Sequence, residues 1–113
     1  MIFRCTDRDG IEIMCTKDTW QNHIVAEHPE MIGCESYVKQ TIENPDCVYE
    51  DFKYKSTKNF YTSPTLPTQV SYPYLRVSVK YHKNVLGKTR GYVKSAFPCV
   101  SKRKGDRLIW EKQ

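Results

Sequence analysis

The segment from Tyr74 to His82 constrains the fold of this chain more than any other. Apolar side chains alternate with polar or amphipathic ones along it, and the apolar set is Leu75, Val77, Val79 and Tyr81. A period of two residues is that of a β-strand with one buried and one solvated face, as in antiparallel sheets. We therefore predict a strand over 74–82, with Arg76, Lys80 and His82 on its solvated face.

Shorter runs of β-branched and aromatic residues predict further strands. At the N-terminus, Ile2–Cys5 and Ile11–Cys15 flank an Asp-Gly turn at Gly10, which predicts a β-hairpin because glycine readily takes the positive φ of a tight turn. The other predicted strands are Cys47–Phe52, Asn59–Thr62, Gly91–Cys99 and Leu108–Trp110.

Two helices are expected between the hairpin and the later strands. Thr16 or Asp18 is positioned to cap a helix over Trp20–His28, which ends before Pro29. A second helix is expected over Glu35–Glu43. A chain of 113 residues supports one domain, 1–113. The predicted fold class is therefore α+β, with the hairpin and two helices packed on one face of an antiparallel sheet and the other face open.

The net charge of +5 conceals a strong asymmetry between the two halves of the chain. Residues 1–56 contain six basic and eleven acidic side chains, a balance of −5, whereas residues 57–113 contain twelve basic and two acidic side chains, a balance of +10. A basic half built of strands predicts a surface for a polyanion. The alternative is a solvated basic surface without a partner.

Features that the sequence lacks predict where the protein is located in the cell and what state its cysteines are in. There is no apolar run long enough to span a bilayer and no signal-peptide pattern at Met1, so we expect a cytoplasmic protein without membrane association. The five cysteines are odd in number and form no C-x-x-C pair, so we expect them to be buried or half-buried apolar residues.

The sequence also bounds the chemistry. Metal-ligand spacings, nucleotide-binding glycine motifs and nucleophile-elbow motifs do not occur, so we expect no metal and no cofactor. RNA cleavage without a metal needs a base, an acid and cations, and His23, His28 and His82 are candidates for the proton transfers. On an α-helix, His23 and His28 diverge by about 140° and flank the apolar stripe of Trp20 and Ile24. The structural alternatives are a hydrogen-bonded boundary role for His23 and a helix-ending role for His28.

Several motifs together resemble the phage-associated nuclease domains of the barnase, EndoU, colicin and RelE-like (BECR) fold. The motifs, in order, are Trp20-x-x-His23-Ile24-x-x-x-His28-Pro29-Glu30, Thr41-Ile42-x-Asn44-Pro45-Asp46-x-Val48, the strand Tyr74 to Tyr81, Val93-x-Ser95-Ala96-Phe97-Pro98, and Gly105-x-x-x-Ile109-Trp110. The resemblance implies a small metal-independent ribonuclease of a phage, mobile-element or toxin setting, with two N-terminal helices on a curved antiparallel sheet.

The resemblance also implies roles for individual residues. His23 and His28 correspond to helix histidines that exchange protons, Arg76 and Lys80 to cations that stabilise the phosphorane, and Ser95 to a hydroxyl that positions the scissile phosphate. Together with this catalytic set we expect substrate contacts from Tyr61, His82 and Lys94.

The expected products are a 2′,3′-cyclic phosphate and a 5′-hydroxyl, and the expected partner is RNA, such as transfer RNA or ribosome-associated RNA. Two alternatives use the same basic face. One is a non-catalytic RNA-binding or translation-associated module, and the other is a protein that docks onto an acidic partner such as an immunity or antitoxin protein.

Overall fold

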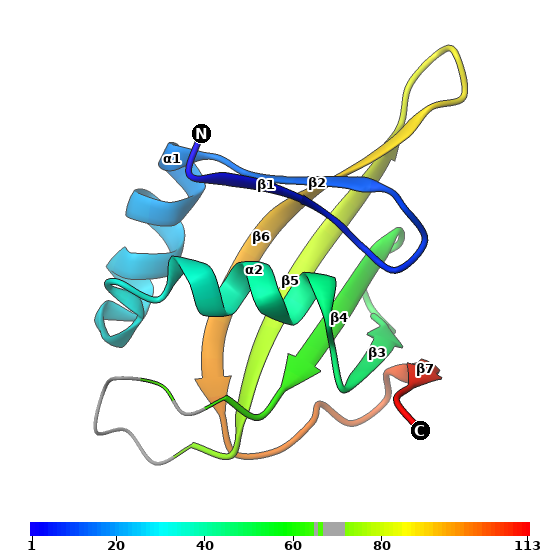
Figure 1. The fold of residues 1–113 in the computed structure, drawn as a ribbon. Coiled ribbons are helices and arrows are strands. Elements are labelled where there is room, and N and C mark those ends of the chain that lie inside the picture. Colours follow the sequence, from blue (N-terminus) through cyan, green and yellow to red (C-terminus); the bar gives the residue numbers. More distant parts are fainter. Residues whose placement is uncertain (65, 67–71) are drawn as a thin grey trace.

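The computed structural model describes residues 1–64, 66 and 72–113, and has an α+β fold (Figure 1). The strands of this part of the chain form one seven-stranded sheet in the order β1-β2-β6-β5-β4-β3-β7. The strands are β1 (Phe3–Thr6), β2 (Glu12–Cys15), β3 (Cys47–Glu50), β4 (Thr57–Thr62), β5 (Tyr74–Lys83), β6 (Thr89–Cys99) and β7 (Arg107–Glu111). The helical elements are α1 (Lys17–Thr19), η1 (Trp20–Val25), η2 (Pro29–Met31) and α2 (Glu35–Glu43).

The local elements predicted from the sequence are largely confirmed. Strands β1 and β2 form the expected hairpin, in which Gly10 has a φ of +78°. Helix α2 has the predicted bounds, and Thr16 caps the first helix by accepting a hydrogen bond from the backbone N–H of Thr19 at 3.2 Å. Strands β3 to β6 follow one another as an antiparallel meander.

The sheet is mixed, so the prediction of a purely antiparallel sheet is wrong at one pair. Strand β2 runs parallel to β6, with Ile13 opposite Gly91 and Met14 opposite Tyr92. Strand β7 does not extend the meander beyond β6 but pairs with β3 at the opposite edge. Because β2 and η1 already pack against β6, the free edge of β3 is the one that β7 can join.

The first helix is not a regular α-helix. After one turn of α1 it continues as the π-helix η1, which packs beside β6 (Figure 1). The hydrogen bonds of a π-helix join residues that are five apart in the sequence. Two residues at this spacing therefore lie closer to the same side of a π-helix than of an α-helix. Trp20 and Ile24 are buried as predicted. Within the described residues, no helix is long and apolar enough to cross a membrane.

The hydrophobic core lies between one face of the sheet and the helices. Helix α2 packs on β1, β4 and β5, and the fully buried side chains at this contact include Val38, Ile42 and Val77. Four cysteines are buried, Cys99 is half-buried, and all five thiols are unpaired, as the sequence predicts. Burial raises the pKa of the Cys5 and Cys15 thiols to about 12, so both stay protonated at neutral pH.

Gly91 lies where β2 pairs with β6, and the packing there leaves no room for a side chain. A Cβ atom at this position would overlap the Ile13 side chain and lie 2.8 Å from Val79 Cγ1. We predict that Gly91→Ala lowers the free energy of unfolding by about 1–3 kcal/mol, measured by urea titration, because the added methyl group has no room. The neighbouring exposed change Arg90→Ala is the control, with an effect of roughly 0.5 kcal/mol or less. Equal stability of Gly91→Ala and the wild type would contradict this packing.

Candidate functional site

The sheet face opposite the helices carries the polar side chains of β5 and β6. Arg76, Ser78, Lys80 and His82 alternate with the buried residues of β5, so the predicted shared face is confirmed. This face is not fully open, because residues 51–56 and 100–106 cover part of it: Lys80 donates a hydrogen bond to the Lys55 carbonyl, and Arg103 reaches Asp51.

A shallow groove on this face gathers two imidazoles, two lysines and two tyrosines. Its volume is about 510 Å³, within the range of roughly 300–1,000 Å³ that is typical of ligand sites. It is lined by Thr19, His23, Tyr54, Lys80, His82, Tyr92, Val93 and Lys94. The groove thus unites four residues that the sequence analysis singled out, namely His23, Lys80, His82 and Lys94.

Five segments build the groove: α1, η1, the 51–56 loop, β5 and β6. His23 comes from η1, and its side chain is 59% exposed. His82 lies on β5, with its ring edge-on to Tyr92 of β6 at a centroid distance of 5.8 Å. The ammonium of Lys94 lies 4.3 Å from the ring centroid of Tyr54, which comes from the 51–56 loop. The groove therefore brings an imidazole from the helix and one from strand β5 to the same basic, aromatic surface.

A β-bulge places Lys94 in the groove. The ladder between β5 and β6 pairs Ser78 with Ser95 and then Val79 with Val93, so Lys94 has no partner in the register. Bulges of this kind re-aim a side chain and are common next to functional sites. The alternation in the sequence predicted a strand here but could not predict where the extra residue falls.

Lys80 has a structural partner. Its ammonium donates a hydrogen bond to the Lys55 carbonyl, and the next residue, Tyr81, donates its backbone N–H to the Ser56 carbonyl at 2.8 Å. Both bonds fasten the 51–56 loop to β5. Lys80 therefore holds the groove wall that carries Tyr54.

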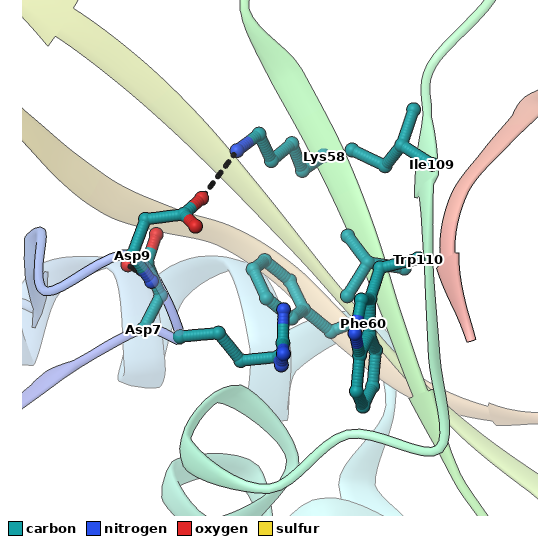
Figure 2. Close-up of a pocket in the computed structure, with 8 residues that line it drawn as sticks. Asp7, Asp9, Lys58, Phe60, Ile109 and Trp110 are labelled. Atoms are coloured by element: carbon teal, nitrogen blue, oxygen red, sulfur yellow. Dashed lines mark hydrogen bonds and ion pairs between the residues drawn. The ribbon is translucent and has the colours of Figure 1, made fainter. Parts of the chain in front are cut away.

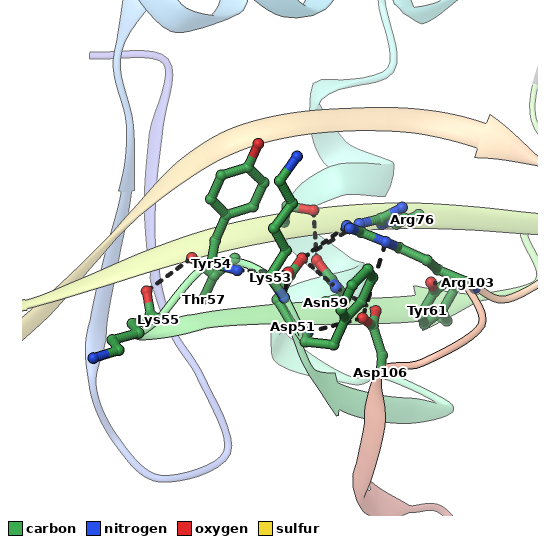
Figure 3. A network of polar contacts seen from close by, with 12 residues as sticks. Asp51, Lys53, Tyr54, Lys55, Thr57, Asn59, Tyr61, Arg76, Arg103 and Asp106 are labelled. Atoms are coloured by element: carbon green, nitrogen blue, oxygen red, sulfur yellow. Dashed lines mark hydrogen bonds and ion pairs between the residues drawn. The ribbon is translucent and has the colours of Figure 1, made fainter.

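A buried polar network lies next to the groove, centred on the carboxylate of Asp51 (Figure 3). This carboxylate accepts hydrogen bonds from the Asn59 amide at 3.1 Å and from Arg103 Nη1 at 3.0 Å, and Arg76 Nη2 lies at 3.8 Å. Asn59 in turn accepts from the Ser78 hydroxyl at 2.6 Å and donates to Asp106 at 2.8 Å. The network joins strands β4 and β5 to the two segments that cover them.

These contacts change the ionisation of Asp51. Burial opposes its charge, but hydrogen bonds from the backbone of Tyr54 and Lys53 and from the side chain of Asn59, together with the charge of Arg103, lower the pKa of Asp51 to about 2. The carboxylate is thus ionised at neutral pH.

Arg76 and His28 meet at the far end of the same strands, outside the groove lining. Both contact the ring of Phe97: His28 stacks on it at a centroid distance of 4.9 Å, and the Arg76 guanidinium carbon lies 5.5 Å from its centroid. His28 Nδ1 also lies 3.4 Å from Glu30 Oε1. Among the described residues, Arg76 Nε is buried and has no hydrogen-bond partner. Ser95 is half-buried on β6 between the two ends.

The two helix histidines therefore share a side, contrary to the α-helical prediction that they flank the stripe oppositely. His23 lines the groove beside Lys94, and His28 stacks on Phe97, so both meet residues of β6. The π-helical turn supplies the reason, because it shifts the angular position of every residue that follows it.

Tyr61 occupies a different environment from the one predicted. Its ring is 1% exposed, with edge-on contacts to Tyr49 and Tyr74, and its hydroxyl accepts a hydrogen bond from the Arg103 backbone N–H at 3.2 Å. The predicted substrate contact is therefore wrong for the ring, which has no free face. Tyr61 instead supports the covering segment.

Sequence reasoning missed Tyr54, Tyr92 and the Asp51 network. Tyr92 alternates with Val93 in the predicted strand and could have been assigned to the solvated face by that signal. Tyr54 lies in a segment without periodicity, and Asp51 meets Arg103 across 52 residues of sequence. No local sequence pattern predicts the position of Tyr54 in the groove or the contact between Asp51 and Arg103.

A second, smaller pocket of about 120 Å³ lies on the helix side, and the polar side chains that line it contact one another or the aromatic wall (Figure 2). The Arg8 guanidinium lies 3.7 Å from the ring centroid of Trp110, and Lys58 pairs with Asp9 at 3.5 Å. Asp7 accepts a hydrogen bond from the Tyr81 hydroxyl at 2.6 Å. These contacts fix the β1–β2 hairpin over the core, and we assign the pocket a structural role.

No group of three or more His, Cys, Asp or Glu side chains suited to a metal ion occurs in the part of the chain that the structure describes. No protein-family model, curated protein or solved structure matches the chain. The candidate site therefore stands on its own geometry.

We predict that Asp51→Asn lowers the free energy of unfolding at pH 7 by about 3 kcal/mol, because it removes the buried anion that the half-buried Arg103 and Arg76 share. The exposed change Asp46→Asn serves as the control.

Because the pKa of Asp51 is depressed on folding, its charge stabilises the fold above pH 4 and ceases to do so as the pH falls towards 2. The stability gap between wild type and variant, from urea titrations at several pH values, should narrow by about 2 kcal/mol over that window. A gap independent of pH would contradict the role of the charge.

Proposed function

We propose that this protein is a metal-independent endoribonuclease that acts at the groove between η1 and strands β5 and β6. The observation that carries the proposal is that His23 and His82, from distant parts of the sequence, line one groove with Lys80 and Lys94. Imidazoles exchange protons near neutral pH, and ammonium groups stabilise phosphate charge. The basic balance of residues 57–113 supports an RNA ligand.

The reaction needs no group beyond the substrate and these side chains. One imidazole removes the proton of the ribose 2′-OH, whose oxygen attacks the adjacent phosphorus. The bond from phosphorus to the 5′-oxygen breaks, and the other imidazole, as imidazolium, protonates that oxygen. Lys94 stabilises the negative charge of the phosphorane. The products are a 2′,3′-cyclic phosphate and a 5′-hydroxyl.

Tyr54 and Tyr92 supply surfaces on which bases can stack, because both are at least partly exposed in the groove. Arg76 is held by Asp51 and Lys80 by Lys55, so in this proposal both act mainly as positioning residues. The unpaired thiols fit a reducing compartment such as the cytoplasm, where RNA is available. The nuclease family resemblance supports the same activity from sequence motifs alone.

We predict that purified protein cuts RNA in EDTA and leaves the 2′-deoxy substrate intact, with a bell-shaped dependence of rate on pH. His23→Gln and His82→Gln should each lower the cleavage rate on the order of 10²-fold or more with little change in Tm. Prepared identically, these variants also control for contaminating nuclease.

His28→Gln tests the position of the site. Loss of activity in this variant, with His82→Gln active, would move the chemistry to the Phe97 end of the strands. Cleavage that stops in EDTA and returns with Mg²⁺, or equal cutting of the 2′-deoxy substrate, would overturn the mechanism. RNA binding without cleavage would favour the non-catalytic RNA-binding module.

A separate prediction concerns binding. If Lys94 neutralises an RNA phosphate, Lys94→Gln should reduce the slope of log affinity against log salt by roughly 0.7 on a single-stranded RNA. Fluorescence anisotropy with a 2′-O-methyl RNA, which cannot react, measures this slope. Lys39→Gln, a change on α2 far from the groove lining, is the control. An unchanged slope for Lys94→Gln would remove Lys94 from the RNA contact.

A further inference from the structure

The β5–β6 hairpin extends beyond the rest of the sheet as an arm, residues 82–90 (Figure 1). The ladder with β4 ends at Lys80, and the ladder with β2 ends at Gly91. In the arm itself, His82 pairs with Arg90 and Lys83 with Thr89. The base of the arm adjoins the groove, because His82 is part of its lining.

The tip of the arm is an ordered turn organised by Asn84. Its side-chain oxygen accepts hydrogen bonds from the backbone N–H groups of Leu86 and Lys88, both at 2.9 Å. The backbone N–H of Gly87 donates to the Asn84 carbonyl at 3.0 Å, and Gly87 has a φ of +83°, which favours glycine. The turn therefore orders the backbone that carries its two intervening side chains.

Those two side chains are apolar and fully in solvent. Val85 is 102% exposed and Leu86 is 89% exposed, the two highest values among the large apolar residues of the described chain. These adjacent aliphatic side chains stand on an ordered turn at the end of a projecting arm, and they would gain free energy if a partner covered them.

The charges around the tip indicate the kind of partner. Residues 52–105 contain no aspartate or glutamate, so the arm lies within a stretch whose fixed charges are all positive. Lys83 and Arg90 are exposed on its two strands and Lys88 is exposed in its turn, and of these Arg90 lies near a carboxylate, 3.7 Å from Glu12. An anionic partner that also offers apolar surface fits both features, and nucleic acid has both, in its phosphates and its base faces.

We propose that the arm recognises a base-paired stem next to the strand held in the groove, with Val85 and Leu86 packed on the exposed face of the terminal base pair. The strand rise places the tip roughly 10 Å beyond His82, so a ligand must extend past the groove to reach it. Lys83 and Lys88 then neutralise phosphates of the stem. This inference rests on the proposed function and specifies its substrate class as structured RNA.

The test compares two RNAs that share one single-stranded segment, only one of which carries an adjoining hairpin stem. Both are made with 2′-O-methyl groups for binding and with 2′-OH groups for cleavage. The variant is the double change Val85→Ser and Leu86→Ser, which leaves Asn84 and Gly87 in place. Ile32→Ser, at an apolar residue that is 65% exposed elsewhere on the protein, is the matched control.

We expect the wild type and Ile32→Ser to bind the stem-bearing RNA about tenfold more tightly than the single strand, and the double variant to lose this preference. Its cleavage of the single strand should be unchanged. If the wild type bound both RNAs equally well and cleaved normally, the role of the arm would be overturned and the proposed function would stand. Absence of RNA binding altogether would overturn the proposed function as well. The tip would instead be a membrane contact if the wild type sedimented with phosphatidylserine vesicles, the double variant did not, and both bound RNA equally well.

Discussion

The buried carboxylate of Asp51 is the interaction on which the candidate site depends. It binds the backbone at the start of the 51–56 loop, Asn59 of β4 and Arg103 of the returning segment. A buried charge is stable only when its oxygen atoms are satisfied, and here two arginines and several N–H donors do so. Because the loop that begins at Asp51 carries Tyr54 and the carbonyl that holds Lys80, the groove wall follows from this one anchor.

The opposite wall depends on the irregular helix. A regular α-helix over Trp20–His28 could bury Trp20 and Ile24 but would direct His23 and His28 to opposite flanks. The π-helical segment keeps both apolar residues buried and turns both imidazoles towards β6. The packing of η1 beside β6 thus buries Trp20 and Ile24 in the core and also places His23 in the groove.

Charge and exposure differ between the two sides of the molecule. The helix side consists of core, hairpin contacts and the pocket lined by Arg8 and Trp110, where Arg8, Lys58 and Asp7 have partners within the chain. The other side presents Lys94, His23 and the projecting arm, whose side chains are largely exposed. Residues 57–113, which carry a balance of +10, supply Lys80, Lys94 and the arm on this side.

The sequence by itself determined the elements, because caps, turns and hydrophobic periods act over a few residues. It placed the Gly10 turn, helix α2 and the alternation of β5, and with them the shared face of Arg76, Lys80 and His82. Only the tertiary structure decided the parallel β2–β6 pair, the bulge at Lys94 and the burial of Tyr61. These depend on contacts between residues far apart in the chain, such as Asp51 with Arg103 across 52 positions, for which neighbouring residues leave no signal.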